Sequence, residues 1–204
     1  MTPRVELVKR QRSSAGGFVS RPLKVVVTGP FSAGKTTMIE TISEVAIVGT
    51  DRDITDDTRG VKARTTVAMD FGRITFADQL SLFLFGTPGQ RRFEVMWEIL
   101  SDGMLGFILL VNAADERSLE EGAHILDTFR AYADVPFVVG VTHLDEADVS
   151  PDDVMSGVRE RLSLGSEVDV VACDARDREH VKGLLLNVLM GVLSRLEAVD
   201  VAAG

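Results

Sequence analysis

The sequence predicts a three-layer α/β/α domain, in which about six mostly parallel strands carry helices on both faces. Short apolar runs rich in β-branched residues alternate with longer amphipathic segments. The runs are continuously apolar, which is typical of strands buried on both faces. The amphipathic segments lie between successive runs, where they can serve as crossovers between parallel strands.

The expected strands share a short apolar core that is bounded by polar or turn-forming residues. In chain order they are Leu23–Thr28, Thr66–Arg73, Leu80–Phe85, Gly106–Asn112, Phe137–Val141 and Val168–Ala172. A turn around Ala77-Asp78 joins the second and third. The polar segment 49–64, rich in Asp, Thr and Arg, reads as a long loop before the second strand.

The expected helices share apolar residues at helical spacing. In chain order they are Lys35–Val45, Arg91–Leu100, Glu116–Tyr132, Pro151–Leu162 and Arg178–Val199. The third shows the pattern most clearly, with Leu119, Ala123, Leu126 and Phe129 on one face. Ser150 is a suitable N-cap for the fourth, because Pro151 fits the first helical position.

The chain divides into a basic arm, residues 1–20, and one domain, residues 21–204. The net charge is −9, from 22 basic and 31 acidic residues, yet residues 1–24 carry +5 and leave −14 for the remainder. An acidic body argues against binding to nucleic acid. We expect the arm to be mobile, and it is either a solvated leader or a contact for an acidic membrane or partner.

Composition predicts a cytoplasmic protein without an intrinsic membrane anchor. Cys173 is the single cysteine, so no internal disulfide can form. The longest apolar run, Met104–Val111, is far shorter than the roughly 20 residues that cross a bilayer. The ends carry neither an apolar signal core nor a lipidation motif. Any membrane recruitment would come through a partner or the basic arm.

The strongest motif is Gly29-Pro30-Phe31-Ser32-Ala33-Gly34-Lys35-Thr36, a phosphate-binding loop between an apolar strand and a helix. Its backbone N–H groups and the helix N-terminus attract phosphate oxygens. Lys35 adds charge at the β and γ phosphates, and the Thr36 hydroxyl can ligate Mg²⁺. We expect the following residues to contact the nucleotide: Gly29, Ser32, Ala33, Gly34, Lys35, Thr36 and Thr37. The alternative is a chance match in a glycine-containing turn.

Four further segments follow this loop in order. They are Thr66-Val67-Ala68-Met69-Asp70-Phe71, Gly86-Thr87-Pro88-Gly89-Gln90, Thr142-His143-Leu144-Asp145 and Cys173-Asp174-Ala175-Arg176. Together the five segments resemble the Ras-like small GTPases, most closely the bacterial MglA-like branch and the GTPases of actinobacterial conservon operons. The resemblance covers roughly Lys24 to Leu196 and implies a P-loop NTPase fold of the Ras-like type that binds GTP or GDP with Mg²⁺.

The second and third segments resemble the two switches of these GTPases. The resemblance implies that Thr66 joins Mg²⁺ and senses the γ phosphate, that Gly89 donates its N–H to that phosphate, and that Gln90 orients the attacking water. Gly86 stands where the family has aspartate, so the usual indirect Mg²⁺ carboxylate is missing. An ordinary edge strand and a tight turn without a nucleotide role are the alternatives.

The last two segments resemble the base-reading loops. Asp145 would accept hydrogen bonds from the guanine N1–H and exocyclic amine, a donor pair that adenine lacks. Thr142 and His143 replace the usual Asn and Lys, and Thr142 would tie this loop to the phosphate loop. Cys173, Asp174 and Ala175 would line the base, with the Ala175 N–H directed at guanine O6. A helix-capping role is the alternative for Asp145.

Two positions bear on the hydrolysis rate. Phe31 replaces the glycine usual in Ras-like phosphate loops, and its ring would crowd the attacking water, so we predict slow hydrolysis. Arg64 is a candidate catalytic arginine in cis, because MglA-like proteins carry one near this point. Arg59 is a second candidate, and a solvated loop arginine is the simpler interpretation.

The resulting prediction is a regulatory GTPase that uses Lys35, Gln90 and Arg64 in slow catalysis and cycles between GTP and GDP states. Two alternatives stay open: a nucleotide-binding scaffold with negligible turnover, and a P-loop ATPase or nucleoside kinase. The resemblance suggests a roadblock-type regulatory protein, together with other signalling proteins, as partners on the switch side.

Overall fold

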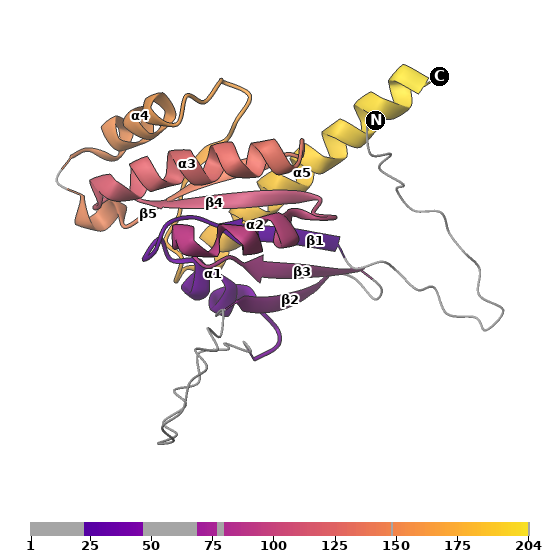
Figure 1. Cartoon of the computed structure of the whole chain (residues 1–204), viewed down its shortest axis with the longest axis horizontal. Helices are drawn as coiled ribbons and strands as arrows, with labels where there is room; N and C mark the ends of the chain where they lie inside the picture. The colour runs from indigo at the N-terminus through magenta and orange to yellow at the C-terminus, as the bar shows by residue number, and fades with distance from the viewer. Residues whose placement is uncertain (1–22, 47–68, 77–79, 148, 204) are drawn as a thin grey trace.

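The computed structural model describes residues 23–46, 69–76, 80–147 and 149–203 (Figure 1). Its strands are β1 (Leu23–Thr28), β2 (Asp70–Phe76), β3 (Leu80–Gly86), β4 (Gly106–Asn112), β5 (Phe137–Thr142) and β6 (Val170–Ala172). Its α-helices are α1 (Lys35–Ile42), α2 (Glu94–Ser101), α3 (Glu116–Tyr132), α4 (Pro151–Arg161) and α5 (Arg178–Ala203). Two 3-10 turns, Arg91–Phe93 and Leu144–Glu146, precede α2 and follow β5.

The strands form one sheet in the order β2-β3-β1-β4-β5-β6. All neighbours are parallel except β2 and β3, which pair antiparallel. Helices α1 and α5 cover one face, and α2, α3 and α4 cover the other (Figure 1). The predicted three-layer, mostly parallel α/β fold is therefore confirmed.

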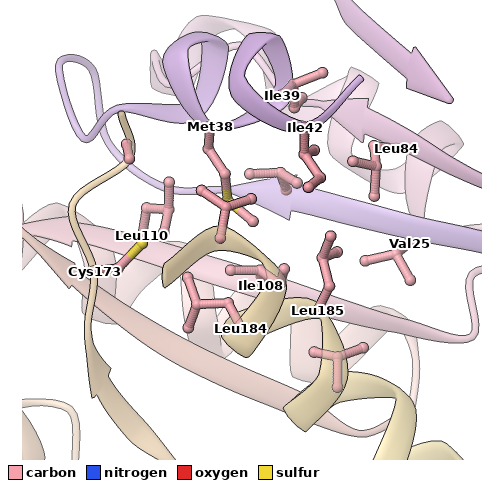
Figure 2. Close-up of a cluster of buried hydrophobic side chains, with 14 of the residues drawn as sticks. Val25, Met38, Ile39, Ile42, Leu84, Ile108, Leu110, Cys173, Leu184 and Leu185 are labelled. Atoms are coloured by element: carbon pink, nitrogen blue, oxygen red, sulfur yellow. The ribbon is translucent and has the colours of Figure 1, made fainter. Parts of the chain in front are cut away.

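Alternate residues of the central strands enter two different cores, which explains the unbroken apolar runs. Val25 and Val27 of β1 pack with α1 and α5, whereas Val26 packs with α2 and α3. Figure 2 shows residues of the first core, among them Met38 and Ile42 of α1 and Leu184 and Leu185 of α5. Both faces of the central strands β1 and β4 are buried, as expected for parallel strands between helices.

Several element boundaries differ from those predicted. Helix α2 begins at Glu94, after the 3-10 turn, and α5 continues to Ala203. Helix α1 ends at Ile42 because Ser43 is extended and its hydroxyl hydrogen-bonds the backbone of Val45. Strand β2 continues past Arg73 to Phe76, because it pairs with β3 over its whole length. Strand β6 is limited to the three residues that pair with β5. Residues 66–68 of the predicted second strand lie outside the described residues.

The fold gathers the predicted motifs at one edge of the sheet. The phosphate loop follows β1, the turn 87–90 follows β3, and the two base-side segments follow β5 and β6. The first residue of antiparallel β2 reaches the same edge. Helix α5 extends away from the sheet at its C-terminal end (Figure 1). No helix in the described part of the chain is long and apolar enough to span a membrane.

Candidate functional site

A cavity of about 1060 Å³ opens at the carboxyl edge of the sheet. Most of the predicted site residues line it: Ser32, Gly34, Lys35, Thr36, Thr37, Gly89, Gln90, Thr142, His143, Asp145, Cys173, Asp174 and Ala175. Gly29 and Ala33 do not line it. Thr66 and Arg64, with the alternative Arg59, lie outside the described residues.

The phosphate loop takes its shape from three residues with left-handed backbone, Gly29 (φ 142°), Ser32 (φ 63°) and Gly34 (φ 90°). A side chain at Gly29 would place its Cβ 2.2 Å from the carbonyl oxygen of Leu110, so only glycine fits there. Gly34 directly precedes α1, whose N-terminus opens into the cavity. The loop therefore has the backbone form that concentrates N–H groups around an anion.

Lys35 is the cation of this loop. Its side chain is buried, and Nζ donates to the carbonyl oxygens of Gly29 at 2.8 Å and Pro30 at 2.5 Å. Burial lowers the pKa of the ammonium from 10.5 to about 8, against the attraction of Asp70 and Glu121. A bound polyanion would stabilise the charged form of this ammonium.

Asp70 also lines the cavity, and motif analysis did not include it among the site residues. Its Oδ2 accepts a 2.6 Å hydrogen bond from the Thr36 hydroxyl. Asp70 pairs with Gly86 across the β2–β3 ladder, and a Cβ at Gly86 would lie 2.9 Å from the Asp70 Cβ. The carboxylate thus occupies space that an aspartate on β3 would use. A hydroxyl and a carboxylate in contact beside the phosphate loop are oxygen donors of the kind that Mg²⁺ prefers, so these residues fit the ion.

The turn after β3 is fastened to the rest of the fold before Gly89. The Thr87 N–H donates to the carbonyl oxygen of Val27 at 2.9 Å, and its hydroxyl lies 2.9 Å from that of Thr28. Gly89 then passes directly over the phosphate loop, because a Cβ there would lie 2.9 Å from Lys35 Nζ. Gln90 follows, exposed and facing the cavity.

On the base side, Thr142 joins three segments. Its hydroxyl lies 3.2 Å from the carbonyl oxygen of Ala33 in the phosphate loop and 3.1 Å from that of Val111. His143 Nδ1 lies 2.9 Å from the same hydroxyl, and His143 itself has a left-handed backbone (φ 57°). Threonine therefore ties the loop after β5 to the phosphate loop through its single hydroxyl.

The carboxylate of Asp145 faces an arginine from the other base-side loop. Arg176 Nη2 lies 3.6 Å from Asp145 Oδ2, and Nε and Nη2 of the same guanidinium each bond Asp174 at 2.9 Å. These bonds, together with the Arg176 backbone N–H, lower the pKa of Asp174 to about 2. Asp145 is exposed, so its oxygens are open to a ligand. Arg176, which motif analysis did not place in the site, links the two loops.

Cys173 lies under this loop and is buried. Desolvation, together with the nearby charges of Asp174 and Asp177, raises the pKa of its thiol to about 12. A thiol with such a pKa stays protonated at neutral pH and is a poor nucleophile. The residue packs in the first core beside Leu110 and Leu184 (Figure 2).

A strand, a glycine-rich loop with a buried lysine, and a helix that starts at that lysine are the parts by which P-loop NTPases hold phosphates, and the chain is of this class. Residues 47–193, which follow the phosphate loop, match the family described as "Conserved hypothetical ATP binding protein", and the chain belongs to that family.

Individual relatives agree with this class. An uncharacterized protein of Methanocaldococcus jannaschii is 31% identical over 133 residues, which are 65% of this chain and 77% of that protein. Translation initiation factor IF-2 of Rubrobacter xylanophilus is 29% identical over 185 residues, 88% of this chain and 24% of the factor. The same factor of Geobacillus sp. is 27% identical over 177 residues, 85% of this chain and 22% of the factor.

The chain spans about a quarter of the length of these initiation factors. The similarities support membership of the P-loop GTPase superfamily as a nucleotide-binding protein. These similarities do not support assignment to the narrower MglA-like branch.

Proposed function

We propose that this protein is a GTP-binding switch that uses Mg²⁺ and hydrolyses GTP slowly. The observation that carries the proposal is the presence in one cavity of Lys35, in the phosphate loop, and the exposed carboxylate of Asp145, in the segment after β5. The similarity to IF-2 supports guanine as the base. The family description names ATP, so ATP is the competing ligand.

In this proposal the phosphate loop and Lys35 hold the β and γ phosphates, and Asp145 accepts hydrogen bonds from the guanine N1–H and amine. Thr36, Asp70 and Thr66 would hold Mg²⁺, which neutralises charge on the phosphates when bound. Gly89 donates its N–H to the γ phosphate, and Gln90 orients the attacking water.

Slow turnover follows from Phe31. Its side chain is 69% exposed and lines the same cavity as Gly89 and Gln90, where it would reduce the room for water or for an arginine from an activating protein. A scaffold with negligible turnover is the limiting case of the same argument. The MglA-like branch, a roadblock-type partner and a catalytic role for Arg64 belong to this proposal and rest on the motif resemblance.

The proposal is tested by competition against fluorescent GDP with GTP, GDP, ATP and ADP, for the natural protein and for Asp145→Asn. Xanthine carries a carbonyl where guanine carries its amine, so an amide at position 145 should accept xanthosine diphosphate in place of GDP. We expect GDP affinity to fall by on the order of 10²- to 10⁴-fold, with xanthosine diphosphate gaining affinity.

A gain of affinity cannot come from misfolding, so the variant is its own folding control. Glu146→Gln removes the neighbouring carboxylate of the same cavity and should leave the preference for guanine unchanged. If ADP competes as well as GDP and Asp145→Asn changes neither, Asp145 does not read the base and the ATP interpretation replaces the GTP one.

A further inference from the structure

Helix α2 carries the chain's single tryptophan, which reaches back to the turn that passes over the phosphate loop. Trp97 is fully buried, and its indole Nε1 donates a 2.9 Å hydrogen bond to the carbonyl oxygen of Pro88. Pro88 directly precedes Gly89 in the turn. A buried indole N–H requires a hydrogen-bond acceptor, and here the acceptor is the backbone carbonyl of the residue that precedes Gly89.

The carbonyl of Pro88 and the N–H of Gly89 belong to one peptide group. That group is trans, so its C=O and N–H point in opposite directions across a rigid plane. Fixing the oxygen toward the indole therefore fixes the direction of the Gly89 N–H. Because the Gly89 backbone passes over Lys35, the N–H is held on a part of the turn that borders the phosphate site.

The chain before this peptide is anchored, so the ψ of Pro88 is the torsion left to turn the peptide. Thr87 is held by the carbonyl of Val27 and by the Thr28 hydroxyl, and the ring of Pro88 fixes its own φ. Glycine at position 89, in contrast, leaves the chain free to turn after the peptide. The orientation of this one peptide thus depends on the preceding anchors and on the indole.

The indole packs against helix α3. The Trp97 ring lies 6.2 Å from the ring of Phe129 and 6.3 Å from that of His124. On the same side of α2, Glu94 lies 3.6 Å from His124 Nε2 and accepts a 3.4 Å hydrogen bond from the Thr128 hydroxyl. The donor that holds the Pro88 carbonyl is therefore part of a packed helix pair.

We propose that Trp97 is a positioning residue that orients the Pro88–Gly89 peptide so that the Gly89 N–H is preset to receive a γ phosphate. This inference rests on the γ-phosphate role of Gly89 in the proposed function, and it is independent of the base. Trp97 touches no nucleotide and acts through the peptide. Loss of its N–H should weaken binding of triphosphates and leave binding of diphosphates unchanged.

The test compares Trp97→Phe, which keeps an aromatic ring in the core and removes the donor, with Phe129→Leu. The second variant removes a ring from the same cluster and keeps the indole N–H, so it is the matched control. For each protein, the affinities for GDP and for a non-hydrolysable GTP analogue are measured with Mg²⁺, together with the Tm. The same pair is measured in the adenine series, so that a wrong base assignment does not obscure the result.

We expect Trp97→Phe to bind the triphosphate analogue about tenfold more weakly, as loss of a hydrogen bond to a half-buried carbonyl implies, with diphosphate affinity within about twofold. Phe129→Leu should lower the Tm and leave the ratio of the two affinities unchanged. Equal loss for both nucleotides, no loss for either, or the same ratio change in Phe129→Leu would overturn the inference. Selective binding of adenine nucleotides with the Trp97→Phe ratio change would overturn the guanine proposal alone.

Discussion

Replacing Asp70 by asparagine tests whether Asp70 on β2 supports Mg²⁺ binding in place of the aspartate that Ras-like GTPases carry on β3, at the position of Gly86. The amide keeps the shape of the side chain and an oxygen that can accept from the Thr36 hydroxyl, now 2.6 Å away, so the fold should be retained. What is lost is one negative charge beside the hydroxyl that would ligate Mg²⁺. Groups that hydrogen-bond a metal ligand typically contribute 10- to 100-fold in metal affinity.

We therefore expect Asp70→Asn to raise the Mg²⁺ concentration for half-maximal retention of fluorescent GDP by about 10- to 100-fold. The assay follows the GDP release rate as Mg²⁺ is titrated from micromolar to millimolar. Asp127→Asn, which removes an exposed carboxylate from α3, is the control for net charge. An unchanged half-saturation in Asp70→Asn would refute the reasoning, because it would show that this carboxylate does not support the metal.

The reciprocal exchange sharpens the test. Gly86→Asp alone brings a second carboxylate against Asp70, at 2.9 Å between Cβ positions, and also meets Ile39 Cδ1 at 2.9 Å. We expect this variant to lose about 1–3 kcal/mol of unfolding free energy. Combining it with Asp70→Gly removes the first clash and restores one carboxylate to the ladder position. The double variant should recover much of the Mg²⁺ affinity that Asp70→Gly alone loses.

Three further predictions follow from the same cavity. Because the pKa of Lys35 is about 8 in the free protein and a bound polyphosphate raises it, binding takes up a proton above pH 8, and nucleotide affinity should fall by up to about tenfold per pH unit there. Lys35→Arg, whose side chain stays charged, should flatten the profile measured between pH 7 and 9, and a flat profile in the natural protein would contradict the assignment. Phe31→Gly removes an exposed ring at little cost in stability and should speed single-turnover GTP hydrolysis about tenfold, or about 1.4 kcal/mol of barrier; an unchanged rate means that the ring does not limit access. Cys173, with a pKa of about 12, should resist iodoacetamide at pH 8 in the folded protein and react once urea exposes it, as followed by mass spectrometry, and rapid labelling of the native protein would show the thiol to be accessible.

The fold could be predicted because its signals are local. Each apolar run is set by its own residues, and a two-faced sheet follows from runs such as Gly106–Asn112, in which every residue before Asn112 is buried. The phosphate loop has a fixed spacing, so Lys35 and Thr36 could be placed from the motif alone. Boundaries that depend on tertiary pairing, such as the extension of β2 to Phe76, could not be.

Asp70 was missed for a related reason. Its role depends on the register of an antiparallel pair, and motif spacing carries no such information. The signal was nevertheless present, because Asp70 and Gly86 are each eight residues from Asp78 in the predicted turn, and positions equally distant from the centre of a hairpin face each other. The contacts of Trp97 with Pro88 and of Arg176 with Asp145 join residues 9 and 31 positions apart, which neither composition nor periodicity reveals.

The place of Asp70 has a mechanical consequence. Among the described strands, β2 has β3 as its single neighbour, and Asp70 is its first residue. A carboxylate on β3 would belong to a strand that pairs on both sides, whereas the Asp70 carboxylate belongs to the edge strand of the sheet. Peeling back the start of β2 would draw the carboxylate from Thr36 and leave the phosphate loop and Asp145 in place. Metal affinity could then change while the contacts of the phosphate loop and Asp145 with the nucleotide stay in place. A partner protein that binds the edge strand β2 could therefore alter metal binding without opening the nucleotide site.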